Sequence, residues 1–145
     1  MGQPAEGPLR GWGLTTGWGA GLESLPQQVP VTGQRHAILP VVTPVSTSER
    51  LRRATRECLL GVAAVQMALE AAQLLPSDLA GPGTALVYAS ASSYAAANWS
   101  FVTHATEQAL HFPYTAPSAV PAEVSIQFGI TGPYVTLLSG ANAGI

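Results

Sequence analysis

The chain has 145 residues, a formal net charge of −2 and no lysine. This length is enough for one domain with a hydrophobic core and too short for two such domains. Because nucleic-acid binding needs clustered basic side chains on one face, the composition disfavours a nucleic-acid partner. Apolar residues make up 47% of the chain and charged residues only 10%. We therefore expect apolar surface that contacts another subunit or the rest of a larger fold.

The single cysteine, Cys58, rules out an intramolecular disulfide and cannot form a thiolate metal site alone. His104 and His111 have no carboxylate or second histidine at metal-ligand spacing, so we predict surface positions for both, and neither a metal nor a cofactor. The first thirty residues do not resemble a secretory signal. Polar residues interrupt the apolar stretch from Leu59 to Leu75, which disfavours a membrane span. The expected location is cytoplasmic.

The N-terminal part is rich in glycine and proline. Residues 1–9 are predicted to be a flexible N-terminus. Leu9 to Leu14 predicts a short opening strand, followed by a loop shaped by several glycines. These glycines lack the spacing of a dinucleotide-binding loop. The segment from His36 to Val42 predicts a weak strand that Pro40 limits.

A long helix is predicted next. Ser46 and Glu49 have the spacing of a capping box at its start. One helical face then carries residues at alternating steps of four and three, namely Leu51, Thr55, Cys58, Val62, Val65, Leu69 and Ala72. This periodicity predicts a helix that ends near Leu74, before Pro76. Because Cys58 lies on the apolar face, we expect it to be a buried packing residue.

Four arginines stand near the start of this predicted helix: Arg50, Arg52, Arg53 and Arg56. One interpretation is a solvated first turn. The other is a contact surface for an acidic partner. Cations near a helix N-terminus oppose its dipole, and this keeps the partner hypothesis open.

Strands and helices alternate in the second half of the chain. Thr84 to Ala89 predicts a buried strand, and the segment from Tyr94 to Leu110 a helix. Pro121 is well placed to open a short helix that ends at Gly129. Tyr134 to Leu138 predicts a last apolar strand. The alternation indicates an α/β fold with a mainly parallel sheet.

Four segments resemble the N-terminal part of a β-ketoacyl synthase, of the thiolase-like superfamily, in order and spacing. They are Gly11 to Leu25, the long helix with Thr84 to Ser90, Pro113 to Pro133, and Gly132 to Gly144. The resemblance implies an incomplete αβαβα layered fold, with residues 10–145 forming a partial N-terminal domain. It covers only the first third or so of a typical member, whose catalytic histidines would follow Ile145.

The fourth segment resembles the strand and elbow that deliver the family's nucleophilic cysteine. At a helix start, the helix dipole and nearby N–H donors favour the thiolate and stabilise an oxyanion. Counted from Gly132 and from Gly144, the cysteine position falls on Ala141, with Gly140 and Asn142 beside it. A methyl side chain cannot be acylated. If the register were shifted, Ala141 would simply be a small residue at a helix start.

The resemblance implies a preferred hypothesis and leaves two alternatives. The preferred one is a non-catalytic, chain-length-factor-like subunit of fatty-acid or polyketide biosynthesis. It would pair with an active synthase subunit, or with itself, through Tyr134, Val135, Thr136, Leu137 and Leu138. It would meet an acyl carrier protein through Arg50, Arg53 and Arg56. The first alternative is an N-terminal fragment of an active β-ketoacyl-ACP synthase, an acyltransferase that performs decarboxylative Claisen condensation. The second is an unrelated small α/β binding module.

Overall fold

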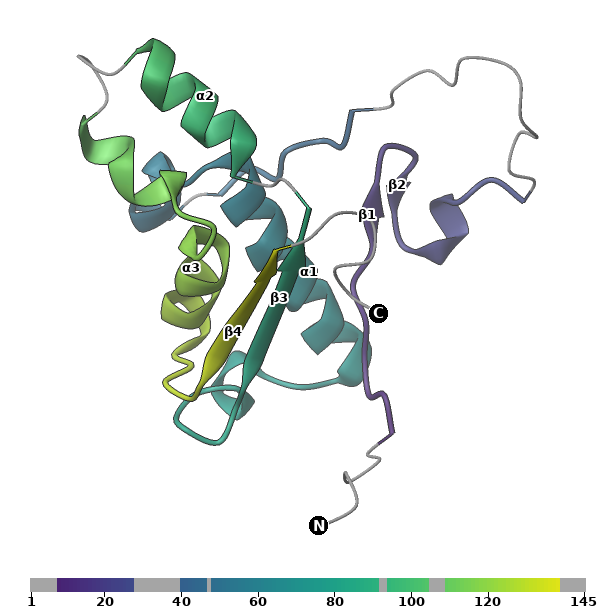
Figure 1. The fold of residues 1–145 in the computed structure, drawn as a ribbon. Coiled ribbons are helices and arrows are strands. Elements are labelled where there is room, and N and C mark those ends of the chain that lie inside the picture. The colour runs from purple at the N-terminus through teal and green to yellow at the C-terminus, as the bar shows by residue number, and fades with distance from the viewer. Residues whose placement is uncertain (1–7, 28–39, 47, 92–93, 105–108, 139–145) are drawn as a thin grey trace.

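The computed structural model describes residues 8–27, 40–46, 48–91, 94–104 and 109–138. In chain order, its strands and α-helices (Figure 1) are β1 (Thr15–Thr16), β2 (Gly19–Ala20), α1 (Arg56–Ala72), β3 (Leu86–Ser90), α2 (Ala95–Thr103), α3 (Ala119–Phe128) and β4 (Tyr134–Leu138). Four short 3-10 helices accompany them, namely η1 (Leu22–Ser24), η2 (Glu49–Arg53), η3 (Pro76–Asp78) and η4 (Ala109–Thr115).

Strands β3 and β4 form a parallel pair, in which Leu86 lies opposite Tyr134 and Ser90 opposite Leu138. Both strands were predicted, and β4 has the predicted bounds. Parallel neighbours need a long crossover, and here α2, η4 and α3 supply it. The prediction of an α/β fold with parallel strands is therefore confirmed for the part of the chain that the structure describes.

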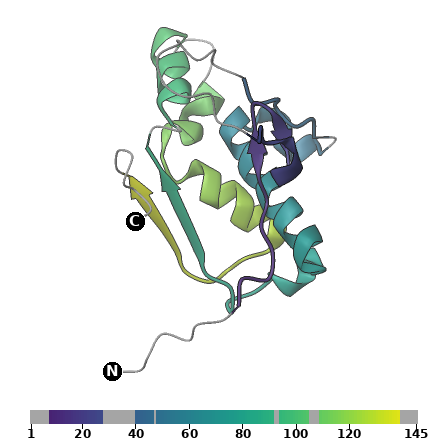
Figure 2. The same ribbon diagram turned by 90° about the vertical axis from the view of Figure 1, so that its right-hand side faces the viewer.

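Helices α1 and α3 lie on the same side of the strand pair (Figure 2) and enclose the core with it. The buried cluster joins Leu69 of α1, Val124 and Phe128 of α3, and Ile130 just beyond α3. Leu86 of β3 packs against this cluster from the sheet. The core therefore forms only on the helix side of the strands.

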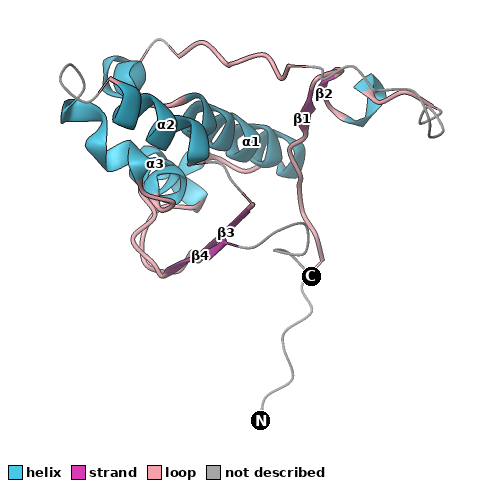
Figure 3. Cartoon of the chain, turned by 45° about the horizontal axis from the view of Figure 1, so that its top comes forward, coloured by secondary structure: helices cyan, strands magenta, loops and turns pink. Residues whose placement is uncertain are grey.

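The opposite face of the strand pair is open (Figure 3). Val87 of β3 is 66% exposed, and its neighbours across the ladder on this face, Val135 and Leu137 of β4, are also exposed. Parallel strands are normally covered on both faces. The expectation of exposed apolar surface is met at this face.

Helix α1 begins later than predicted. Thr55 is its N-cap, and the Thr55 hydroxyl accepts a hydrogen bond from the Cys58 N–H. Residues 49–53 form the separate helix η2, and Ala54 and Thr55 between the two are extended. The Ser46 hydroxyl instead accepts from the Ser48 N–H. The prediction of one helix starting at a Ser46–Glu49 capping box was wrong. Thr55, directly before the first turn of α1, caps the helix that carries the apolar face.

The predicted opening strand at Leu9 to Leu14 was also wrong. This segment has no strand, and the first strands that the structure describes are β1 and β2 just after it, two residues each, which pair antiparallel. Gly11 and Gly13 instead approach the α1 backbone so closely that an added Cβ atom would lie 2.2 Å from the carbonyl oxygens of Ala68 and Ala64. This segment therefore packs against α1 and does not pair in a sheet. The predicted strand at His36 to Val42 lies mostly outside the described residues.

The boundaries of α3 follow proline and glycine, whereas those of α2 do not. Helix α3 starts at Ala119 and places Pro121 in its first turn, where an N–H has no intrahelical partner. Gly129, with φ 67°, ends α3 in the left-handed conformation, as predicted. Helix α2 ends at Thr103, earlier than the predicted Leu110. None of the helices that the structure describes is both long enough and apolar enough to cross a bilayer.

Candidate functional site

The sequence-predicted elbow follows β4 at the carboxyl edge of the strand pair. In open α/β sheets, ligand sites lie beyond this edge. Strand β4 ends at Leu138, opposite Ser90 of β3. Gly140, Ala141, Asn142 and Gly144 lie outside the described residues, so the structure gives the strand that leads to the elbow and not the elbow itself.

Strand β4 has one edge paired with β3 and a second edge with no strand partner among the described residues. The Leu86 N–H donates to the Pro133 carbonyl oxygen at 3.0 Å. By the alternation of a parallel ladder, the N–H and C=O groups of Tyr134, Thr136 and Leu138 then point to the second edge. The Thr136 hydroxyl is buried and has no hydrogen-bond partner. The predicted pairing strand therefore carries backbone groups along its outer edge that no described strand binds.

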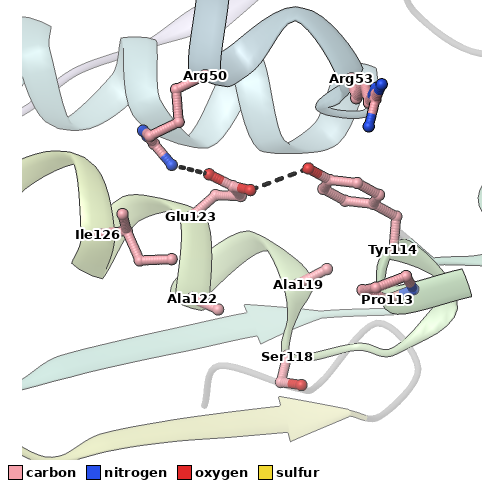
Figure 4. A pocket seen from close by; sticks show the side chains of 9 residues that line it. All are labelled: Arg50, Arg53, Pro113, Tyr114, Ser118, Ala119, Ala122, Glu123 and Ile126. Carbon is pink, nitrogen blue, oxygen red and sulfur yellow. Dashed lines mark hydrogen bonds and ion pairs between the residues drawn. The ribbon is translucent and has the colours of Figure 1, made fainter. Parts of the chain in front are cut away.

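A pocket of about 450 Å³ opens between η2, η4 and α3 (Figure 4). It contains two of the three arginines predicted to contact a carrier protein. Its lining residues are Arg50, Arg53, Pro113, Tyr114, Ser118, Ala119, Ala122, Glu123 and Ile126. The pocket thus combines two guanidinium groups, two hydroxyls and one carboxylate with apolar walls.

Glu123 of α3 links three elements within this pocket. One carboxylate oxygen, Oε2, forms an ion pair with Arg50 Nη1 of η2, and the other, Oε1, accepts a hydrogen bond from the Tyr114 hydroxyl at 3.0 Å. The second Arg50 nitrogen, Nη2, donates to Gln127 Oε1 at 2.7 Å, one turn further along α3. The Glu123 side chain is 13% exposed and that of Arg50 37%. The carboxylate is therefore well enclosed and the guanidinium is partly in solvent.

The Tyr114 hydroxyl stays protonated at physiological pH. Burial, followed by the hydrogen bond to Glu123, raises the pKa of Tyr114 to about 12. The raised value means that the folded state holds the phenol proton more tightly. The stabilisation from this hydrogen bond is fully present below the ordinary pKa near 10 and is lost as the pH rises toward 12.

The arginines differ in what they contact. Arg53 lines the pocket and, among the residues that the structure describes, makes no ion pair or hydrogen bond. Arg52 forms an exposed pair with Glu49 at 3.4 Å. Arg56 donates to the Val41 carbonyl oxygen at 3.0 Å and does not line the pocket. The structure thus brings Arg50 and Arg53 together and turns Arg56 to another segment.

Cys58 is a packing residue, as the sequence predicts. Its side chain is fully buried, and the Thr55 hydroxyl donates to its sulfur at 3.2 Å. Burial raises the pKa of the Cys58 thiol. A buried thiol with a raised pKa is a poor nucleophile. His104 is exposed at the end of α2, and His111 stacks at a tilt against Tyr114 with ring centroids 6.3 Å apart.

Sequence reasoning missed Glu123 and Tyr114. One signal was present for Glu123, because it is the only charged residue after Glu107. A single carboxylate in an otherwise uncharged helix usually has a partner when it is enclosed. No comparable signal marks Tyr114, which meets Glu123 only through the fold.

Comparison with known families identifies one match. The model described as "Beta-ketoacyl synthase, N-terminal domain" matches residues 42–143, more than half of the chain. No curated protein matches the chain. The matched range includes η2, all of α1, α2 and α3, both parallel strands and residue 141. It starts after the glycine-rich segment Gly11 to Leu25, whose resemblance stays a prediction. With parallel strands that lead to the elbow position, this match establishes that the chain belongs to the β-ketoacyl synthase family and is an N-terminal part of its thiolase-like α/β fold.

Proposed function

We propose that the chain is a catalytically silent, chain-length-factor-like subunit of fatty-acid or polyketide biosynthesis. The residue that carries the proposal is Ala141, which lies inside the matched range and which, counted from Gly132 and Gly144, we assign to the position of the nucleophilic cysteine. A methyl group has neither a lone pair nor an acidic proton, so it cannot accept an acyl group. Cys58 offers no substitute, because it is fully buried on α1. Membership in the family also removes the reason to interpret the chain as an unrelated α/β binding module.

The test is acylation of the purified chain. After incubation with an acyl-loaded acyl carrier protein, intact-mass spectrometry should find no added acyl group on the native chain. An active β-ketoacyl synthase in the same reaction should gain one acyl group per chain. Stoichiometric acylation of the native chain at any residue would overturn the proposal.

The proposed partner surface is the outer edge of β4, where the chain would pair with an active synthase subunit or with a second copy of itself. Two observations support it. The N–H and C=O groups of alternate residues point outward along this edge, and the open face beside it is apolar at Val135 and Leu137. Exposed strand edges are templates for pairing with another chain. A partner strand at this position would extend the sheet across the interface.

We expect the Thr136→Pro variant to lose self-association or pairing with a synthase subunit. Proline removes the N–H of a residue whose backbone groups face the outer edge, and leaves the ladder to β3 in place. Thr136→Val is the matched control, because it keeps that N–H and removes only the buried, unpartnered hydroxyl. Sedimentation velocity of each variant, alone and mixed with a synthase, measures the result. If both variants assemble like the native chain, the β4 edge is not the interface.

We also propose that an acyl carrier protein binds at the pocket of Arg50 and Arg53. The support is complementary chemistry, since two cations beside the apolar walls of Ile126 and Pro113 suit an acidic helix with apolar side chains. The third predicted contact, Arg56, is held by Val41 outside the pocket. Arg53 is the cation of this pocket that has no partner among the described residues, so it should contribute most to binding.

The alternative, an N-terminal part of an active synthase, shares the fold and the carrier site with the preferred function. It differs at residue 141, where it needs either an unusual nucleophile or a sequence that has been altered at this position. The open apolar face of β3 and β4 fits both functions, because either a partner subunit or further chain would cover it. The acylation test separates them, since only an active synthase would form an acyl-enzyme.

A further inference from the structure

We infer that Glu123 competes with the carrier protein for Arg50, because it occupies Arg50 in the free chain. The inference rests on the proposed carrier site and adds a residue that sets its strength. Arg50 and Arg53 lie on the same short helix and line the same pocket, but among the described residues Arg50 has an ion-pair partner and Arg53 has none.

The contacts of Arg50 explain why it is occupied. Both terminal nitrogens of its guanidinium are used, Nη1 by Glu123 and Nη2 by Gln127. The two acceptors stand four positions apart, and therefore on the same side of α3. Together they hold the planar guanidinium against the helix. Because a guanidinium has five N–H groups, an incoming carboxylate either displaces one of these acceptors or shares the positive charge of Arg50 with Glu123.

Glu123 is itself held in position. Its second carboxylate oxygen accepts the Tyr114 hydroxyl, so the side chain is fixed from η4 as well as from η2. The exposed pair between Arg52 and Glu49 has no such support, and its nitrogen and oxygen are 3.4 Å apart. A carboxylate fixed in advance loses less side-chain entropy on pairing and so competes better for Arg50 than a mobile one.

The consequence is a pocket whose positive charge is partly cancelled in the free chain. Removing the charge of Glu123 should leave Arg50 available and let an acidic partner contact both arginines. Because Arg50 is partly in solvent, the gain is that of a screened pair, about two- to fivefold in affinity. It should shrink at high salt, since screening weakens contacts between exposed charges.

The experiment measures binding of two probes, an acyl carrier protein and a synthetic helical peptide rich in glutamate, to the full 145-residue chain. Glu123→Gln removes the charge and keeps a hydrogen-bonding side chain. Glu123→Asp keeps the charge and shortens the reach to Arg50. Glu70→Gln is the matched control, because it changes the net charge equally on α1, where Glu70 accepts a hydrogen bond from Gln66. Circular dichroism confirms that each variant is folded.

We expect both probes to bind Glu123→Gln about two- to fivefold more tightly than the native chain, Glu123→Asp to an intermediate extent, and Glu70→Gln no differently from native. Equal tightening by Glu123→Gln and Glu70→Gln would reduce the effect to net charge and overturn the inference, as would unchanged or weaker binding to Glu123→Gln. Arg53→Gln tests the proposed carrier site separately. If the carrier binds no variant while the peptide still distinguishes Glu123→Gln from Glu70→Gln, the carrier proposal fails and the competition by Glu123 stands.

Discussion

Replacing Phe128 with alanine should lower the free energy of unfolding by about 3–5 kcal/mol. Phe128 is only 5% exposed and packs with Leu69, Val124 and Ile130 in the buried cluster between the helices and the strands. Losing the ring removes apolar area from the core and leaves a cavity that surrounding helices fill only in part. Few other side chains are buried this deeply, so the loss falls on the centre of a small core.

Ile126→Ala is the matched control for this prediction. Ile126 lies two residues earlier on α3 and is 63% exposed, so the same helix keeps its backbone while losing little buried area. Its expected cost is within about 0.5 kcal/mol. Urea unfolding followed by far-ultraviolet circular dichroism measures both variants. Equal destabilisation of the two would mean that the cluster around Phe128 does not form the core.

The sequence predicted best where local chemistry and tertiary packing agree. Gly129 ends α3 because only a left-handed residue closes that turn, and β4 has the predicted bounds because an apolar run follows the Gly132–Pro133 turn. Capping chemistry was less decisive at the start of α1. Two hydroxyl residues, Ser46 and Thr55, could each have begun a helix, and the choice depended on which turn carries the face that packs against α3.

The N-terminal strand could not have been predicted correctly from local pattern. Gly11 and Gly13 look like residues of a strand and loop, but each lies where a side chain would collide with the backbone of α1. That contact depends on a helix some fifty residues later in the chain and has no local signature.

The candidate site also contains residues that the sequence predicted and residues that it did not. The arginines were visible as a cluster because they are close in sequence. The partner of Arg50, Glu123, is 73 positions away in the chain, and no periodicity connects the two residues. Only the isolation of that charge in an otherwise uncharged helix indicated that Glu123 has a structural role. The arginines of this site can therefore be predicted from the sequence, but their distant counter-ion cannot. That counter-ion determines how much of the positive charge is available to a binding partner.

The single side chain at residue 141 should decide whether the chain accepts an acyl group. We expect Ala141→Cys, given the acyl-loaded carrier protein, to gain one acyl group per chain, where the native chain gains none. In that exchange the introduced thiolate attacks the thioester carbonyl, the bond to the carrier's sulfur breaks, and the carrier leaves as its thiol. The expectation rests on the proposed assignment of residue 141, just after β4, to the nucleophile position, where a helix start would favour the thiolate.

Ala143→Cys is the control that makes this prediction specific. It introduces the same thiol two residues further along the same segment, away from the position that the family uses. Intact-mass spectrometry and peptide mapping should then find the acyl group on Ala141→Cys alone, with Cys58 unmodified in both variants because it is buried and its pKa is raised. Equal labelling of both variants would show general thiol reactivity. Labelling of neither would show that the missing thiol at residue 141 is not the only reason why the chain accepts no acyl group. Labelling confined to Ala141→Cys would instead mean that the chain keeps the elbow of a condensing enzyme and that the elbow lacks only its nucleophile.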